Sequence, residues 1–192
     1  EGTFLENGCG LGHVRLSIID LYRGHQPMCK KREGNTYAII LNGEIYNMKP
    51  LKEQLIKEGE VFSTTSDTEV VLTGYIRHGI SYMEQLNGIF AIALWDGKRK
   101  KLYLIRDRVG VKPLFYSLKD DNFIFSNEIK SLLKSNLIEP IVNEDGLKEL
   151  FTMSPSFTPS LTPFKDIKMV KPGEYIIYED NLLSKVLLPA PV

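Results

Sequence analysis

The sequence predicts a mixed α+β domain in which helices and antiparallel strands occupy separate stretches of the chain. Apolar runs at residues 88–96, 101–106 and 123–126 follow one another with charged turns between them, which is typical of a β-meander. Helical periodicity occurs earlier, over residues 50–59 and 66–76, so the chain lacks the regular alternation of strands and helices that builds a parallel sheet. Its 192 residues, 43% of them hydrophobic, are enough to close one sizeable core.

The first half of the chain should contain two strands and then two helices. Polar and apolar side chains alternate over residues 10–21, as in a half-buried strand. Residues 36–41 form an apolar β run, which we expect to end in a sharp turn at Asn42-Gly43 because this dipeptide tolerates positive φ. The helix over residues 50–59 should begin at its proline and end at its glycine. The second helix follows a small polar cap, so Asp67 should lie near its N-terminus.

The second half of the chain should contain the meander and a few short helices. A short helix is expected over residues 80–86, before the meander, and two more over residues 128–133 and 144–151. Three prolines and several Ser and Thr residues indicate a loop over residues 154–163. A Pro-Gly turn and a final strand should follow over residues 171–178.

Composition and charge exclude several classes of protein. Lys and Arg number 24, as do Asp and Glu, so no global field draws nucleic acid or an anionic membrane toward the chain. The longest apolar runs are far shorter than the roughly 20 residues that span a bilayer. The first residues lack the features of a signal peptide, and Cys9 and Cys29 show neither disulfide-framework nor metal-site spacing. We therefore expect a cytoplasmic protein with free thiols and no metal site.

Five residues have the chemistry of an amino-acid site. Asn42, Gly43 and Glu44 offer a side-chain amide, an unhindered N–H and a carboxylate, the groups of an oxyanion hole beside an ammonium site. The alternative is a plain structural turn. Arg15 could clamp a carboxylate or be an ordinary ion-paired residue, and Asp67 could accept from an α-ammonium or cap its helix. Together they are a full complement for an amino acid with a reacting side-chain carbonyl.

The sequence offers no evident nucleophile for such a site. Cys9 and Cys29 have ordinary peptide nitrogens, and the three histidines give no spacing that predicts a Cys-His pair, so we expect inert thiols. No HExxH, GxSxG, Walker or GxGxxG motif is present.

A charged turn begins with the string Arg106-Asp107-Arg108. Its charges could form a phosphate site together with the glycine that follows. We favour a structural role, in which the three charged side chains pair with one another between two strands.

Six motifs occur in order along nearly the whole chain: Gly12-His-Val-Arg-Leu-Ser-Ile-Ile-Asp20, Asn42-Gly-Glu-Ile-Tyr-Asn47, Ser66-Asp-Thr-Glu69, Gly88-Ile-Phe-Ala-Ile-Ala-Leu-Trp-Asp96, Arg106-Asp-Arg-Val-Gly-Val-Lys-Pro-Leu114 and Ser126-Asn-Glu-Ile-Lys-Ser-Leu132. This series resembles the glutaminase domain of glutamine-hydrolysing asparagine synthases. Other class II glutamine amidotransferases share the Asn-Gly and Ser-Asp-x-Glu elements, whereas the Arg-Leu-Ser-Ile and Arg-Asp-Arg-x-Gly-x-Lys-Pro-Leu strings are similar to the asparagine synthase branch.

The resemblance implies the N-terminal-nucleophile hydrolase fold, a four-layer αββα sandwich of two antiparallel sheets, here with its first strands missing. It also implies a mechanism. A cysteine exposed by removal of the initiator Met uses its own α-amine as base, attacks the glutamine side-chain amide and forms a thioester that water resolves to glutamate. The freed ammonia travels to an ATP-dependent domain that converts aspartate, through β-aspartyl adenylate, to asparagine.

The family's binding roles transfer to residues of this sequence by motif. The resemblance implies that Asn42 and Gly43 form the oxyanion hole and that Glu44 and Asp67 hold the glutamine α-ammonium. The α-carboxylate would be held by Arg15 with the backbone of Leu16, Ser17, Ile18 and Ile19. The implied partners are glutamine and the synthetase domain, with a homodimer left open. The glutaminase domain itself needs no cofactor or metal, and ATP and magnesium belong to the synthetase domain.

Two departures from the family pattern limit this expectation. The opening Met-Cys-Gly and the ATP-binding Ser-Gly-Gly-x-Asp-Ser loop are absent, so residues 1–192 should be a type 2 glutamine amidotransferase domain, partial at its N-terminus, without its synthetase domain. The chain as written should lack the nucleophile and be inactive. The alternatives are a non-catalytic module that binds glutamine or docks a partner, and an amidotransferase domain that serves a different acceptor.

Overall fold

The computed structural model describes residues 1–14, 24–152, 158 and 160–189. Within these ranges the chain forms eleven strands, four α-helices and one 3₁₀ helix. The strands are β1 (Gly2–Glu6), β2 (Cys9–His13), β3 (Met28–Arg32), β4 (Asn35–Ile45), β5 (Gly88–Asp96), β6 (Lys101–Arg106), β7 (Phe115–Lys119), β8 (Asn122–Ser126), β9 (Lys168–Met169), β10 (Glu174–Glu179) and β11 (Leu182–Leu187). The helices are α1 (Met48–Lys57), α2 (Asp67–His78), η1 (Ile80–Gln85), α3 (Ile129–Leu133) and α4 (Glu144–Thr152).

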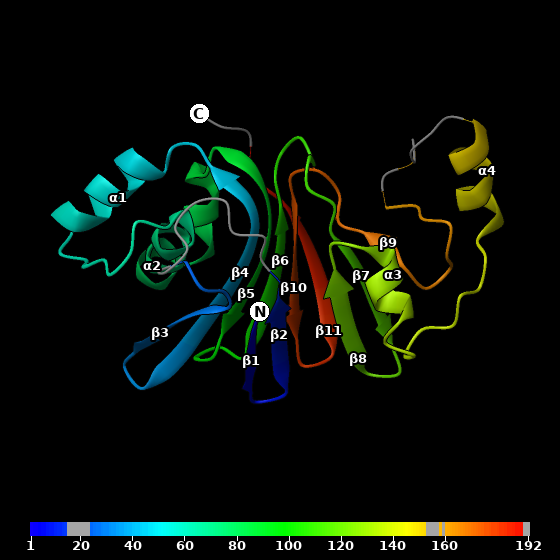
Figure 1. Ribbon diagram of the computed structural model, residues 1–192, viewed down its shortest axis with the longest axis horizontal. Coiled ribbons are helices and arrows are strands. Elements are labelled where there is room, and N and C mark those ends of the chain that lie inside the picture. Colours follow the sequence, from blue (N-terminus) through cyan, green and yellow to red (C-terminus); the bar gives the residue numbers. More distant parts are fainter. Residues whose placement is uncertain (15–23, 153–157, 159, 190–192) are drawn as a thin grey trace.

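Six antiparallel strands form a central sheet, in the order β11-β10-β6-β5-β4-β3. A smaller sheet has the order β8-β7-β9, and β1 and β2 form a separate hairpin. Figure 1 shows α1 and α2 on one side of the central sheet, and the small sheet with α3 and α4 on the other side. The predicted meander is confirmed for β5 and β6, which pair with each other. Its third strand, β8, belongs instead to the smaller sheet, where it pairs with β7.

The side chains of β5 alternate between two cores, as the two-residue period of a strand requires. Those that pack under α2 are Phe90, Ile92 and Leu94. Those that face the hairpin and the small sheet are Ala91, Ala93 and Trp95. A third core lies between the small sheet and α3, around Leu132 and Ile167. The three cores separate four layers in the order helices, sheet, sheet, helices, which is the expected αββα arrangement.

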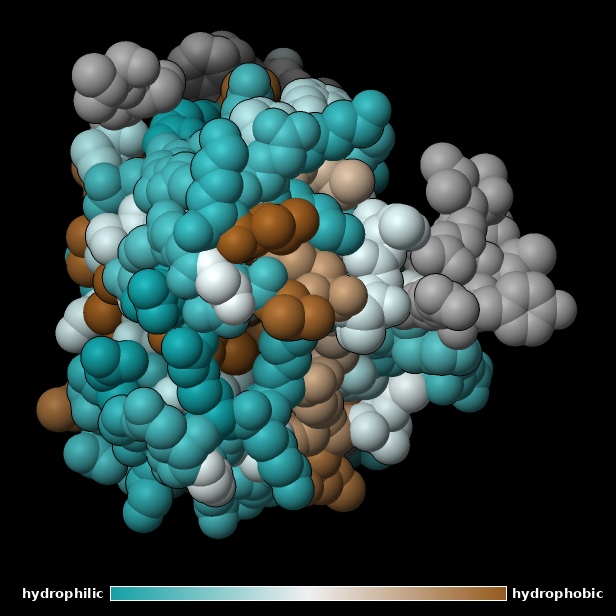
Figure 2. All heavy atoms as spheres, turned by 90° about the vertical axis from the view of Figure 1, so that its left-hand side faces the viewer, coloured by the Kyte–Doolittle hydropathy of each residue, from teal (hydrophilic) through white to brown (hydrophobic). Residues whose placement is uncertain are grey.

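The helix layer beside β4 is built by amphipathic segments. Leu51 and Leu55 are the buried side chains of α1, whereas the outer surface on this side of the molecule is mainly hydrophilic, with a narrow apolar strip (Figure 2). In α2, Ser66 is the N-cap, as the sequence predicts, and the apolar face is buried except for Ile76, which is partly buried. Gly74 packs directly against the Tyr82 ring of η1, where an added Cβ would lie 1.9 Å from a ring carbon.

Several predicted boundaries are wrong. β4 does not turn at Asn42-Gly43 but stays paired with β5 to Ile45, because the partner strand continues the ladder. α1 begins two residues before Pro50, whereas its end is as expected, because Gly59 follows the C-cap Glu58 with a φ of +93°. The sequence also missed β1, β3, β7, β9 and β11. Most of the strand expected over residues 10–21 and half of the loop expected over residues 154–163 lie outside the described residues, and in the described ranges no helix could span a membrane.

Candidate functional site

The candidate site is the outer edge of β4, beyond its pairing with β3. β3 pairs with only the first five residues of β4, whereas β5 follows β4 to its end. In an antiparallel ladder, alternate residues direct their N–H and C=O groups to opposite sides. The Tyr46 N–H donates to Asn87 O, on the β5 side, at 2.8 Å. By alternation, Leu41, Gly43 and Ile45 therefore direct their N–H groups to the open edge.

Two side chains, from the segment before β3 and from the start of α2, hydrogen-bond to the open edge of β4 on either side of Gly43. The Leu41 N–H donates to Oε1 of Gln26 (2.6 Å), and Nε2 of Gln26 donates to the Leu41 carbonyl (3.0 Å). The Ile45 N–H donates to Oδ2 of Asp67 (3.1 Å). Gly43 lies between these two positions, about 7 Å along the strand from each. Its N–H has no such side-chain partner among the described residues.

Gly43 fits this position because it has no side chain. Its φ is +144°, and an added Cβ would lie 1.9 Å from the carbonyl oxygen of Ile89 on β5. An L-residue would therefore be strained by its backbone conformation and would also collide with the neighbouring strand. Residue 43 is therefore glycine for reasons of space and backbone conformation, and it is exposed at this edge.

Asn42 and Glu44 lie on the same face of β4, since strand side chains alternate. This is the face of Ala38 and Ile40, which point toward the smaller sheets. Asn42 lines a cavity of about 90 Å³ between the sheets, together with residues of β2 and β8. Glu44 is exposed, and its carboxylate has no hydrogen-bond or ion-pair partner among the described residues. The amide and the carboxylate predicted for the site are thus side by side.

Asp67 is the first residue of α2, where the sequence places it. Its Oδ1 accepts from the Thr68 N–H at 2.8 Å, a donor that it shares with the N-cap Ser66. Its Oδ2 bonds to β4, so both oxygens are held and each retains acceptor capacity. Asp67 therefore does more than cap a helix, because it joins the start of α2 to the edge of β4.

Glu69, the last residue of the Ser-Asp-Thr-Glu motif, holds the loop that precedes α2. Its buried carboxylate accepts hydrogen bonds from the N–H and hydroxyl groups of Ser63 and Thr64 and pairs with Lys30 at 2.9 Å. Burial alone would raise its pKa, but the hydrogen bonds from Thr64, Ser63 and Lys30 outweigh burial and lower the pKa to about 2. This carboxylate fixes where α2 begins and hence where Asp67 lies.

Asp107 is fully buried and stabilises the backbone behind the site, on the β5 side of β4. Its carboxylate accepts from five backbone N–H groups, those of Phe90, Val109, Gly110, Val111 and Lys112. Phe90 is the β5 residue directly opposite Gly43. Asp107 therefore organises its own loop and anchors the strand against which Gly43 packs.

The structural role expected for the charged turn is confirmed, but the mutual ion pairing is not. Arg106 donates to the carbonyls of Gly110, Lys112 and Val170, and burial lowers its pKa. Arg108 donates to the carbonyl of Glu84, among others. The side chains bond to backbone groups because the turn exposes many unpaired N–H and C=O groups.

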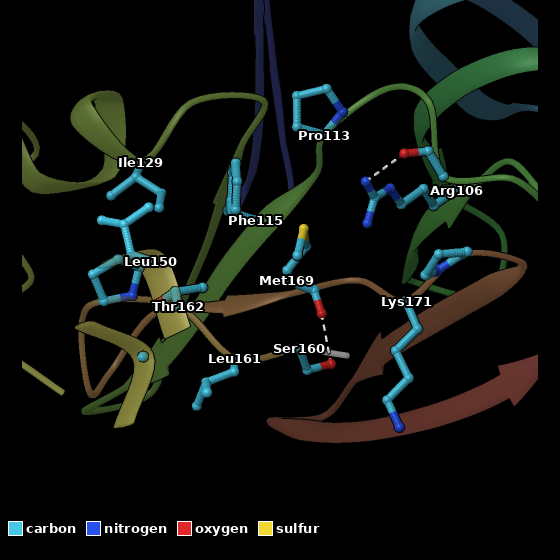
Figure 3. Close-up of a pocket in the computed structure, with 14 residues that line it drawn as sticks. Arg106, Pro113, Phe115, Ile129, Leu150, Ser160, Leu161, Thr162, Met169 and Lys171 are labelled. Carbon is cyan, nitrogen blue, oxygen red and sulfur yellow. Dashed lines mark hydrogen bonds between the residues drawn. The ribbon is translucent and has the colours of Figure 1, made fainter. Parts of the chain in front are cut away.

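A second cavity, of about 610 Å³, lies on the far side of this turn (Figure 3). Phe115, Ile129, Leu150 and Met169 contribute apolar lining, and the Arg106 guanidinium lies at one side, bonded to Gly110 (Figure 3). Because this guanidinium already bonds to three carbonyls, the turn does not resemble a phosphate site. Neither Asn42 nor Asp67 lines this cavity.

The two thiols differ in exposure but neither suits a nucleophile. Cys9 is buried in the core between the sheets, and burial together with the nearby Glu6 carboxylate raises its pKa to about 12. Cys29 is exposed, and burial of part of its side chain together with Glu6 raises its pKa as well. Cys29 pairs with Ala38, four residues or about 13 Å along β4 from Asn42. No cluster of three metal-ligating side chains occurs in the described part of the chain.

The structure brings four predicted site residues to one strand edge, Asn42, Gly43, Glu44 and Asp67. Arg15, Leu16, Ser17, Ile18 and Ile19 lie outside the described residues. Sequence reasoning missed Gln26, whose side chain completes this edge. Its only sequence signal is a position shortly before a strand, which many glutamines share.

Comparison with known proteins decides the family. Residues 1–186 match the family described as the glutamine amidotransferase domain. The chain belongs to this family. It is 43% identical over 173 residues to asparagine synthetase (glutamine-hydrolyzing) 3 of Bacillus subtilis, covering 90% of this chain and 28% of that protein. It is 40% identical over 173 residues to amidase chry2 of Gibberella zeae, covering 90% of this chain and 25% of that protein. The expected resemblance to glutamine-hydrolysing asparagine synthases is thereby confirmed.

The amidotransferase domain spans only about a quarter of the length of these relatives. Among solved structures, the glutamine phosphoribosylpyrophosphate amidotransferase of B. subtilis has a TM-score of 0.67 at 22% identity, covering 95% of this chain and 35% of that one. An allosteric regulatory enzyme of purine biosynthesis has a TM-score of 0.66 at 21% identity, covering 88% of this chain and 32% of that one. These likenesses confirm the predicted N-terminal-nucleophile fold.

Proposed function

We propose that this amidotransferase domain hydrolyses the side-chain amide of glutamine at the edge of β4. The observation that carries the proposal is the Gly43 N–H, which lies on an open strand edge between two positions closed by Gln26 and Asp67. The Asn42 amide is the adjacent donor. Two donors from neighbouring residues suit an oxygen that gains negative charge as a carbonyl is attacked.

Glutamine would be held by its α-amino and α-carboxylate groups. The Glu44 carboxylate is exposed and has no partner among the described residues, and Asp67 retains acceptor capacity beside the same edge, so both suit an ammonium group. Arg15, with the backbone of residues 16–19, is proposed for the carboxylate on the basis of the motif alone. No metal or cofactor takes part in this step.

The reaction proceeds through a thioester. A cysteine thiol adds to the amide carbon, the C–N bond breaks, and the nitrogen leaves as ammonia after taking up a proton. Water then cleaves the thioester, releasing glutamate and restoring the thiol. Cys9 is buried, and Cys29 is distant from Asn42, so neither of these cysteines supplies the thiol. The 192 residues alone should therefore bind glutamine without hydrolysing it.

For the whole protein, we propose that the ammonia serves the ATP-dependent and magnesium-dependent amidation of aspartate to asparagine, in a synthetase domain beyond this sequence. The support is that several relatives are glutamine-hydrolysing asparagine synthetases and that this chain covers only a small share of their length.

The test uses the natural protein that contains this sequence. Ammonia and glutamate are measured after addition of glutamine, and the protein is separately treated with a diazoketone analogue of glutamine and mapped by peptide mass spectrometry. The proposal expects glutamate formation, and one adduct on a thiol other than Cys9 or Cys29, from which glutamine protects. An adduct on Cys9 or Cys29 would refute the assignment of the nucleophile. Binding of glutamine without hydrolysis or adduct would instead show a non-catalytic module.

A further inference from the structure

The Gln26 side chain makes hydrogen bonds to β4 that a longer β3 would otherwise make. The strand partner of β4 on this side ends at Ile39, and the next edge position is Leu41. There the Gln26 side chain accepts from the Leu41 N–H at 2.6 Å and donates to the Leu41 carbonyl at 3.0 Å. A primary amide has one donor end and one acceptor end, so it reproduces the pair of bonds that a neighbouring strand would make.

The Leu41 carbonyl belongs to the peptide unit whose N–H is that of Asn42. A hydrogen bond to this carbonyl therefore restrains the peptide plane immediately before Asn42, and with it the direction in which the Asn42 side chain leaves the strand. Asp67 bonds to the Ile45 N–H at the other end of the same stretch. The backbone of residues 41–45 is thus held at both ends of its open edge, on either side of Gly43.

Gln26 also touches the element that carries Asp67. Its Nε2 lies 3.4 Å from Oγ1 of Thr68, the buried residue that follows Asp67 in α2. The same amide nitrogen therefore contacts both β4 and the start of α2. Both polar atoms of the half-buried Gln26 side chain are thus hydrogen-bonded, to β4 and to the start of α2. These bonds connect the strand that carries the oxyanion donors to the helix that carries Asp67, the carboxylate proposed for the ammonium group.

We propose that Gln26 is a positioning residue of the glutaminase site, which orients the Asn42 amide and the Gly43 N–H through the Leu41 peptide groups. This inference rests on the proposed function. It predicts that loss of the Gln26 amide slows the chemical step and leaves binding of glutamine largely intact, because misplacement of the oxyanion donors affects the transition state more than the ground state.

The test compares Gln26→Met, which keeps the length of the side chain and removes its hydrogen bonds, with the wild-type natural protein. Active sites are counted by stoichiometric labelling with the diazoketone analogue, and kcat is expressed per labelled site. We expect kcat to fall about 10-fold to 100-fold, with KM within about threefold. Gln54→Ala is the matched control, since Gln54 is an exposed glutamine on α1 that bonds only to Glu58 in the described part of the chain.

A merely structural role would reduce the number of labelled sites and leave the rate per site unchanged, which would overturn the inference. Gln26→Glu covers the case in which Gln26→Met does not fold, because it keeps the acceptor for the Leu41 N–H but offers no donor to the Leu41 carbonyl. We expect Gln26→Glu to lower the rate per site as well.

The double variant with Asn42→Ala separates this inference from the proposed function. If Gln26 acts through the oxyanion donors, the losses in Gln26→Met and Asn42→Ala are less than multiplicative. Fully multiplicative losses, or a loss in Asn42→Ala alone, refute the role of Gln26 and leave the proposed function standing. An unchanged rate in Asn42→Ala refutes both.

Discussion

Replacement of Asp107 by asparagine should loosen β5 and the turn after Arg106, which this carboxylate joins. In Asp107→Asn, the remaining carbonyl oxygen can still accept from Val109, Gly110 and Val111, the three donors to Oδ1. The new NH₂ group replaces Oδ2 and faces the N–H groups of Phe90 and Lys112, which lose their acceptor.

The magnitude follows from these two lost bonds. Each hydrogen bond to a charged acceptor contributes about 1.5 kcal/mol, and leaving a buried donor such as the Phe90 N–H unsatisfied costs about 1 kcal/mol more. The sum is about 4 kcal/mol, which is large for a single substitution. Because about 1.4 kcal/mol corresponds to a factor of ten, local opening should become nearly a thousandfold more frequent.

The assay is amide hydrogen exchange of the natural protein, read by mass spectrometry on peptides that contain residues 88–92 and 107–112. Asp107→Asn should speed exchange in both peptides together, since one carboxylate joins them. Asp120→Asn is the control, because Asp120 is an exposed turn residue with positive φ that Asn also tolerates. An exchange rate within about threefold of the wild type in both peptides would refute this reasoning.

Three further predictions concern the strand edge, the loop before α2 and the thiols. Gly43→Ala should lower the melting temperature by several degrees and abolish glutamate formation, because its Cβ would lie 1.9 Å from Ile89 O; an unchanged melting curve would contradict this. Glu69 has a folded-state pKa of about 2 against an ordinary 4.5, so its stabilisation of roughly 3 kcal/mol is complete above about pH 4.5 and is lost as the pH falls toward 2. Glu69→Gln should therefore lower the urea midpoint at pH 7 and flatten its acid dependence, and parallel pH curves for both proteins would count against it. A thiol reagent at pH 8 should label Cys29 and spare Cys9 until the protein unfolds, with peptide mapping as the readout and equal labelling as the contrary result.

The elements that the sequence predicted well are those whose signals are local. α2 combines a Ser cap with an apolar face at helical spacing, and both features are present in the structure. The predicted strands β5 and β6 are strongly apolar and almost entirely buried. The missed strands are mostly short edge strands with polar residues, such as β3 and β11, whose pairing depends on distant neighbours rather than on their own pattern.

The site shows the same division between local and long-range information. The residue types of Asn42, Gly43, Glu44 and Asp67 indicated the chemistry, but the expected turn at Asn42-Gly43 was wrong because β5 keeps this dipeptide within a ladder. Gln26 could not be predicted, since its partner is 15 residues away and is a backbone group without a side-chain signature. The same holds for the Phe90 N–H, which is 17 residues from Asp107, whereas the other four donors to this carboxylate belong to its own turn.

The central claim is that the edge of β4 stabilises the oxyanion of glutamine hydrolysis, and the most direct measurement is kcat for glutamate formation by Asn42→Ala in the natural protein. With active sites counted by labelling, removal of one oxyanion donor should reduce kcat by about 10²-fold to 10³-fold, with KM within a few fold and the melting temperature unchanged. A kcat per site equal to that of the wild type would contradict the account.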